Sequence, residues 1–301
     1  MIKSFEEILK KVKSREMKKV AVAVAQDEPV LEAIRDAKSQ GIADAILVGD
    51  KEEIKRIAAK INMDISGFEI VDEKNPKKAA LKAVELVSTG KADMVMKGLI
   101  DTANFLRSVL NKEIGLRTGA LMSHVAVFEI PGYDRLLFIT DVAFNMYPDL
   151  KAKIAIINNA VKVANAANIE LPKVAPICAV EVVNPDMPAT VEASILSKMS
   201  ERGQIKGCII DGPLSLDIAI SKEAAAHKGV NGKVAGQADI LLMPNIDTGN
   251  VMYKTLTYTT KSKNGGILVG TSAPVILTSR ADSHETKMYS IALAALVANM
   301  K

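Results

Sequence analysis

Short apolar runs alternate with amphipathic stretches along most of the chain. Residues 19–25 alternate valine and alanine and predict a buried strand, and residues 28–40 carry apolar side chains at helical spacing before Gly41. Further strands are predicted at residues 44–49, 68–71, 93–97, 174–180, 207–211, 239–243 and 267–269, and further helices at residues 51–61, 76–88, 150–167 and from about residue 282 onward. Strands separated by helices of this length predict βαβ units and a largely parallel sheet.

The pattern changes between residues 115 and 140. Residues 123–130 and 135–140 are both apolar, and only Pro131-Gly132-Tyr133-Asp134 joins them. Such a short turn predicts an antiparallel hairpin. We interpret the chain as an α/β protein with two three-layer αβα lobes. The first lobe is predicted to contain residues 1–140 plus 276–301, and the second residues 141–275.

Composition narrows the classes of function. The chain has 301 residues, of which 49% are hydrophobic, enough for the cores of two α/β domains. Thirty-nine basic residues are scattered among thirty-five acidic ones, so a nucleic-acid partner is not expected, whereas an anionic small substrate is compatible with the net charge of +4. There is no signal peptide and no apolar run that could span a membrane, so we expect a cytoplasmic protein with no membrane partner.

The cysteines and the absent motifs exclude several kinds of chemistry. Cys178 and Cys208 each lie in an apolar run and are predicted to be buried core thiols. No cysteine or histidine spacing typical of a metal site occurs, and we expect no metal. The sequence also lacks the glycine-rich dinucleotide motif, the phosphate-binding loop and the nucleophile elbow of hydrolases.

A candidate anion site follows the strand predicted at residues 93–97. Gly98 permits a tight turn into a helix, and Asp101 or Thr102 can cap that helix. Free N–H groups at a helix start can hold an anion, which Arg107 could reach from one or two turns further on. The alternative is an ordinary capped helix with one exposed arginine.

Two later strands are followed by segments of the same kind. Residues 244–250 are mostly small and polar, and Gly249 allows a ligand to approach the backbone closely. Ser279 and Asp282 have the spacing of a capping box, which would place Arg280 at a helix N-terminus. A cation there opposes the helix dipole unless an anion is bound nearby. A simple cap is the alternative.

Five segments together resemble the phosphate acetyl/butyryltransferase family and occur in that family's order. They are Lys-Gly-Leu-Ile-Asp-Thr-Ala-Asn-Phe-Leu-Arg (97–107), Ile-Thr-Asp-Val-Ala-Phe-Asn-Met-Tyr-Pro-Asp (139–149), Asp-Gly-Pro-Leu-Ser-Leu-Asp (211–217), Ala-Asp-Ile-Leu-Leu-Met-Pro-Asn-Ile-Asp-Thr-Gly-Asn (238–250) and Thr-Ser-Arg-Ala-Asp-Ser (278–283). The form of the last segment, and a length without an extra N-terminal domain, resemble the butyryl branch.

The resemblance implies lobes of the isocitrate/isopropylmalate dehydrogenase-like type with a central cleft. It implies the reaction butanoyl-CoA + phosphate ⇌ butanoyl phosphate + CoA, by direct transfer in a ternary complex. Coenzyme A would be a substrate, no metal or redox cofactor is expected, and a homo-oligomer is expected. The alternatives are acetyl transfer, a metal-dependent hydroxyacid dehydrogenase of the same fold, and a non-catalytic cytoplasmic ligand-binding protein.

The resemblance also implies roles for individual residues. Ser279 and Arg280 would hold the phosphoryl or carbonyl oxygen, and Arg107 would bind phosphate with Thr102 and Asn104 lining the same pocket. The residues implied to shape the cleft are Asn145, Asp247, Gly249 and Asn250.

The chain departs from the family pattern at one position. Acetyl-type members have an aspartate seven residues after the motif serine and use it as the base for the CoA thiol. That position is Thr286 here, so Asp282 or Glu285 is the candidate base. Alternatively no base is needed, because a thiol with a pKa of about 8.5 is already ionised to a few per cent near neutral pH.

Overall fold

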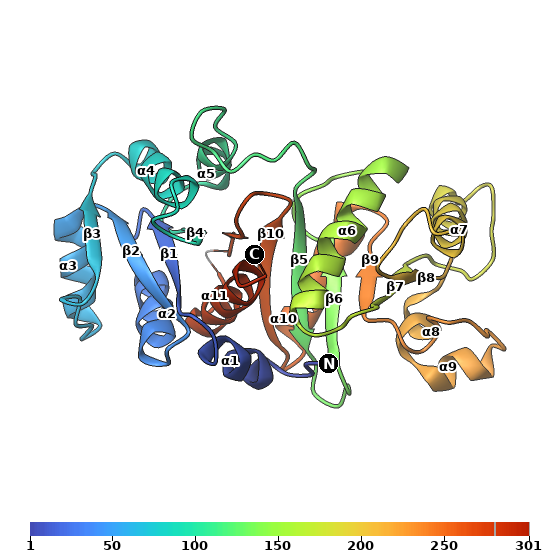
Figure 1. Cartoon of the computed structure of the whole chain (residues 1–301). Coiled ribbons are helices and arrows are strands. Elements are labelled where there is room, and N and C mark those ends of the chain that lie inside the picture. The colour runs from blue at the N-terminus through green and yellow to red at the C-terminus, as the bar shows by residue number, and fades with distance from the viewer. Residues whose placement is uncertain (280, 301) are drawn as a thin grey trace. The chain divides into compact units, whose positions relative to one another are not determined.

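The structure, a computed structural model, describes residues 1–279 and 281–300. It divides into two compact units. Unit 1 contains Met1–Ser4 and Leu121–Lys263, and unit 2 contains Phe5–Ala120 and Asn264–Lys301. Each is built of strands with helices on both sides, so the predicted mixed α/β class is confirmed (Figure 1).

Unit 2 has the strand order β3-β2-β1-β4-β11-β10. Its strands are β1 (Lys18–Ala23), β2 (Ala43–Gly49), β3 (Glu69–Asp72), β4 (Met94–Lys97), β10 (Lys263–Val269) and β11 (Val275–Ile276). Its helices are α1 (Phe5–Lys13), α2 (Glu28–Ser39), α3 (Lys51–Lys60), α4 (Pro76–Ser88), α5 (Thr102–Val109) and α11 (His284–Ala298). The neighbouring strands pair in parallel except β10 and β11, which are antiparallel.

The helices of unit 2 begin where the sequence provides a cap. The side chains of Asp27, Asp50, Asn75 and Asp101 each accept a hydrogen bond from a backbone N–H in the first turn of α2, α3, α4 and α5. Helix α11 lies in the core of unit 2. It is buried on nearly all sides because α1, α2 and the strands β1, β2, β4 and β11 all pack against it (Figure 1).

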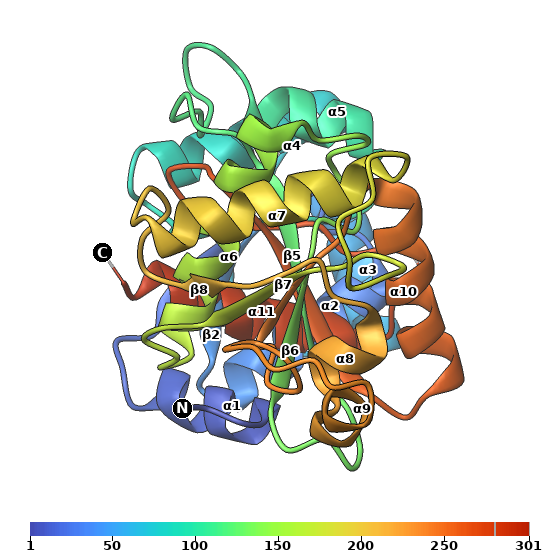
Figure 2. The ribbon, with the colours of Figure 1, turned by 90° about the vertical axis from the view of Figure 1, so that its right-hand side faces the viewer.

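Unit 1 has the strand order β5-β6-β9-β7-β8. Its strands are β5 (Ser123–Glu129), β6 (Leu136–Thr140), β7 (Lys173–Pro176), β8 (Ile209–Ile210) and β9 (Ile240–Leu242). Its helices are α6 (Leu150–Ala166), α7 (Pro188–Glu201), α8 (Leu216–Ile220), α9 (Lys222–His227) and α10 (Ile246–Thr259). Helix α7 runs along one side of β7 and β8, and α8 and α9 lie on the other side (Figure 2).

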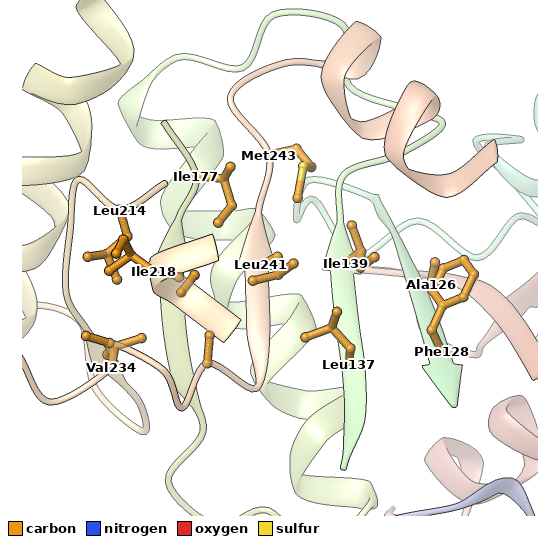
Figure 3. Close-up of a cluster of buried hydrophobic side chains, with 14 of the residues drawn as sticks. Ala126, Phe128, Leu137, Ile139, Ile177, Leu214, Ile218, Val234, Leu241 and Met243 are labelled. Atoms are coloured by element: carbon orange, nitrogen blue, oxygen red, sulfur yellow. The ribbon is translucent and has the colours of Figure 1, made fainter. Parts of the chain in front are cut away.

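The predicted hairpin is confirmed by the antiparallel pairing of β5 with β6. Alternate residues of these strands, including Phe128 and Ile139, point into one apolar core together with Leu241 of β9 and Ile218 of α8 (Figure 3). This period of two follows from the pleat of a strand, which turns successive side chains to opposite faces. The remaining strand residues lie on the face that α6 covers.

The two units do not follow the boundaries expected from the sequence. Residues 121–140 group with unit 1, since β6 pairs in parallel with β9 and the hairpin thus extends that unit's sheet. Residues 264–275 group with unit 2, since β10 pairs with β11 and β11 pairs with β4. The boundaries expected at residues 140 and 275 were placed from local periodicity. Local periodicity does not report these long-range strand pairings.

Both cysteines are free thiols in unit 1. Cys208 is buried and Cys178 is half-buried. Burial raises the pKa of each thiol to about 11, because a thiolate would lose the solvation that water provides. Among the described residues, no helix is both long and apolar enough to cross a membrane.

We expect both thiols of the native protein to react slowly with iodoacetamide. A pKa of about 11 means that thiolate, and with it the rate, rises about tenfold per pH unit between pH 7 and pH 9, whereas an exposed cysteine levels off near pH 8.5. Mass spectrometry of timed samples measures the rate, with urea-unfolded protein as the control. A native rate that levels off near pH 8.5 would contradict the burial of the thiols.

Candidate active site

The first group of predicted site residues lies at one edge of unit 2. Strands β4 and β11 are parallel neighbours, with Met96 paired to Ile276. Their carboxyl ends therefore meet at the same edge, and the segments that follow them leave the sheet side by side. Gly98 makes this possible for β4, because a Cβ atom there would lie only 2.3 Å from the carbonyl oxygen of Val24.

Three polar side chains at the start of α5 form a short chain of hydrogen bonds. The Asp101 carboxylate accepts from the backbone N–H of Asn104 at 2.9 Å and from its side-chain amide at 2.6 Å. Arg107 then donates from Nη1 to the Asn104 side-chain oxygen at 2.8 Å. The hydrogen bonds from Asn104 lower the pKa of Asp101. Of the two predicted caps, Asp101 is the one observed, and Thr102 is the first residue of the helix.

Most N–H donors of Arg107 have no partner among the residues that the structure describes. The side chain is exposed, and the contact with Asn104 uses one of its two terminal nitrogens. Asn104 thereby orients the guanidinium. A guanidinium held in one orientation can bind an anion with two parallel hydrogen bonds.

The segment after β11 forms a tight turn. The Asp282 carboxylate accepts from the Ser279 N–H at 2.7 Å, and the Asp282 N–H donates to the Ser279 carbonyl at 3.2 Å. The Ser279 side chain is exposed and its Oγ accepts from the Ala281 N–H at 3.3 Å. Arg280 lies outside the described residues, so its predicted role stays a prediction.

The predicted helix cap at Ser279 is wrong. Helix α11 begins at His284, and Ser283 is its cap, accepting from the Thr286 N–H at 3.1 Å. The hydrogen bonds between Ser279 and Asp282 instead close the turn that precedes the helix. Thr286, at the position of the acetyl-type base, donates its hydroxyl to the side-chain oxygen of Asn264 at 2.9 Å and so serves this helix start.

A buried lysine lies beneath the same turn. Lys287 of α11 is only 3% exposed, and its Nζ donates to the carbonyl oxygens of Ser279 at 3.0 Å and Asp282 at 2.6 Å. Burial lowers the pKa of Lys287 and raises the pKa of Asp282, while the attraction between the two charges opposes both shifts. Sequence reasoning missed this lysine, and its position inside an apolar helix was the only available signal.

The second group of predicted site residues lies at an edge of unit 1. Strands β6 and β9 are parallel neighbours, with Thr140 paired to Leu242. The Met243 N–H continues the pairing by donating to the Thr140 carbonyl at 2.7 Å. The segments that begin at residues 141 and 244 therefore leave the sheet at the same edge.

Asp141 organises the first of these segments. This carboxylate is buried and accepts hydrogen bonds from the backbone N–H groups of His124, Ala143, Phe144 and Asn145 at 3.1, 2.9, 2.9 and 3.3 Å. It also accepts from the Asn145 side-chain amide at 2.6 Å. One side chain thus fixes both the backbone of the loop and the predicted site residue Asn145. The sequence placed Asp141 inside a family segment but gave no sign of this role.

The start of α10 packs directly on that loop. Gly249 is required there, because a Cβ atom would lie 2.2 Å from the Asp141 carbonyl oxygen. Asn250 donates to the Val142 carbonyl at 3.3 Å, and the Tyr147 hydroxyl donates to the Asp247 carboxylate at 2.8 Å. The structure therefore brings together, around this loop, the four residues that the resemblance implies to shape the cleft, Asn145, Asp247, Gly249 and Asn250, and that role stays a prediction.

Comparison with known proteins identifies the family of the chain. The family model for phosphate acetyl/butaryl transferases matches residues 4–81 and 73–295. The chain belongs to this family. A phosphate butyryltransferase of Clostridium acetobutylicum is 79% identical over 301 residues, which is 100% of each chain. A family member named phosphate acetyltransferase, from Thermotoga maritima, is 47% identical over 93% of this chain and 95% of its own.

A solved structure within the same family shows the same fold. The branched-chain phosphotransacylase of Enterococcus faecalis V583 superposes with a TM-score of 0.82 at 34% identity, covering 94% of this chain and 99% of that one. Within residues 1–279 and 281–300, no group of three or more histidine, cysteine or acidic side chains is arranged to hold a metal ion.

We expect Asp141→Ala to lower the free energy of unfolding by about 3 kcal/mol, because it removes a buried, charged acceptor and leaves the donors around it without a partner. Asp149→Ala is the matched control, since that exposed carboxylate only caps α6 and should cost about 1 kcal/mol. Urea unfolding followed by circular dichroism compares the two variants. Equal losses would show that Asp141 does not hold the loop.

Proposed function

We propose that the chain is a phosphate acyltransferase that catalyses butanoyl-CoA + phosphate ⇌ butanoyl phosphate + CoA. The observation that carries this proposal is the 79% identity, over the whole of both chains, to a phosphate butyryltransferase. Acetyl-CoA is the alternative substrate, because a relative named phosphate acetyltransferase is 47% identical. The two possible substrates therefore differ in the acyl chain that the pocket must hold.

The proposed reaction is a direct transfer. An oxygen of phosphate attacks the thioester carbonyl carbon, the C–S bond breaks, and coenzyme A leaves as the thiolate. In the reverse direction the CoA thiol loses its proton and its sulfur attacks the carbonyl carbon of butanoyl phosphate, releasing phosphate. Both substrates are activated acyl compounds, so we propose no acyl-enzyme, no metal and no redox cofactor. Alignment of the two substrates supplies most of the acceleration.

The site residues receive roles that fit their chemistry. Arg107 binds the phosphate, with Thr102 and Asn104 beside it, and the Ser279 hydroxyl donates to the carbonyl oxygen as charge develops there. We propose that Arg280 contacts the same oxyanion. The residues proposed to bind the remainder of the substrates are Asn145, Asp247, Gly249 and Asn250.

Asp282 is the proposed proton acceptor for the CoA thiol. Burial raises the pKa of this carboxyl and makes it more basic than an exposed aspartate. Thr286 has no basic group. We further propose a homo-oligomer, as the family resemblance implies, and a cytoplasmic location.

The assay of CoA release from butanoyl-CoA and phosphate tests the proposed activity. We expect kcat/KM for butanoyl-CoA to exceed that for acetyl-CoA by at least about tenfold, because two additional methylene groups are buried in a fitting pocket. A preference for acetyl-CoA would support the alternative. If neither thioester releases CoA, the chain is not a phosphate acyltransferase.

We expect Arg107→Ala to lower kcat/KM for phosphate about ten- to a hundredfold. A loss of this size corresponds to the free energy of a charge-assisted hydrogen bond between the guanidinium and phosphate. Arg56→Ala is the matched control, because Arg56 is an exposed arginine of the same unit that pairs with Glu53 of its own helix. Steady-state kinetics with phosphate varied at saturating butanoyl-CoA measures both. Equal constants for the two variants would remove Arg107 from the site.

A further inference from the structure

Lys287 is a charged side chain in an unusual place. It lies in α11 among residues that are almost all buried, and it is 3% exposed. A buried ammonium is costly unless hydrogen bonds and opposite charges compensate it. The contacts that compensate this charge indicate the structural role of Lys287.

The two hydrogen bonds of Lys287 hold both ends of one turn. Its Nζ donates to the carbonyl oxygen of Ser279 at 3.0 Å and to that of Asp282 at 2.6 Å. These are the first and last residues of the turn that the Asp282 carboxylate closes by accepting from the Ser279 N–H at 2.7 Å. The Ser279 backbone is thus bound through its N–H by one side chain and through its carbonyl by another.

Negative charges on two sides favour the ammonium. The Asp282 carboxylate attracts it from within the turn, and Asp27, which follows β1 and caps α2, attracts it from the neighbouring strand end. The strands β1, β4 and β11 are adjacent and parallel, so the segments after all three leave the same edge of unit 2. Lys287 therefore ties the turn to this edge, from which the segment that leads into α5 also leaves.

We propose that Lys287 is a positioning residue for the acyl-transfer site, which sets the place of Ser279 and of the turn that follows it. The inference rests on the proposed function for its effect on catalysis. It assigns Lys287 no contact with a substrate. Its action is to fix where the Ser279 hydroxyl points, and removing it should affect the transition state more than substrate binding.

The experiment compares Lys287→Met, which keeps the apolar stem without the charge, with wild type. We expect kcat to fall about a hundredfold with little change in KM, because displacement of a reacting group by about 1 Å can cost that much. Lys153→Met is the matched control. Lys153 is also a buried lysine on a helix, but it pairs with Glu192 in unit 1, so its replacement should reduce stability and leave kcat near normal.

A double mutant separates positioning from a general loss of structure. In a Ser279→Ala background the positioned hydroxyl is gone, so Lys287→Met should lower kcat by a smaller factor than in wild type, and the factor that remains acts through the proposed base Asp282. Equal factors in the two backgrounds, or a kcat for Lys287→Met within about twofold of wild type, would overturn the inference. Should Lys287→Met not fold, Lys287→Gln, which is neutral and shorter, provides the same comparison.

Hydrogen exchange gives a result that does not depend on the activity. In Lys287→Met the amides of residues 279 and 282 should lose protection while those in the middle of α11 keep it. Unchanged protection in the turn would overturn the inference even if wild type is an active transferase. If wild type is inactive with butanoyl-CoA and phosphate, the proposed function fails, and exchange alone still decides whether Lys287 holds the turn.

Discussion

Parallel pairing of neighbouring strands is the constraint on which the candidate site depends. In unit 2 the pairing of Ile276 with Met96 sends the segments after β11 and β4 out at one edge. In unit 1 the pairing of Thr140 with Leu242 does the same for the segments after β6 and β9. Residues far apart in the chain become neighbours without any contact between their own side chains, because strands that run the same way end on the same side.

Each edge then needs its loops held in one conformation, and the two units solve this problem with opposite charges. In unit 1 the buried Asp141 carboxylate accepts hydrogen bonds from successive backbone N–H groups. In unit 2 the buried Lys287 ammonium donates to the backbone carbonyls of Ser279 and Asp282. A buried charge holds a loop in one conformation effectively. Its hydrogen bonds are costly to break, and only one backbone arrangement satisfies them.

The sequence predicted the elements better than their assembly. Periodicity identified α4 with its observed bounds, Pro76–Ser88, and the hairpin of β5 and β6, because both patterns are local. It missed the two-residue strand β11, and with it the assignment of residues 264–275 to unit 2, because a strand that short is defined by its partner.

The candidate site divides in the same way. Site residues were predicted where a short motif carries them, as with Arg107 and Asn145, and these roles stay predictions. The supporting residues Asp141 and Lys287 were not predicted, because a charged side chain in the sequence does not reveal which backbone groups will surround it. The cap was misassigned for a related reason. Ser279 and Ser283 both precede the last helix, and only the conformation of the turn decides which one accepts from its first N–H groups.

The chemistry of acyl transfer explains why residues that only position the site can affect the rate as strongly as residues that contact the substrate. A thioester and an acyl phosphate are both reactive, so the enzyme has little covalent work to do, and both cysteines, whose burial raises the pKa of each thiol to about 11, are poorly suited to act as nucleophiles. What remains is to align two substrates and stabilise charge on an oxyanion, and both effects fall steeply with small displacements. A side chain that never touches the substrate can then matter as much as one that does, provided that it determines where the contacting group lies.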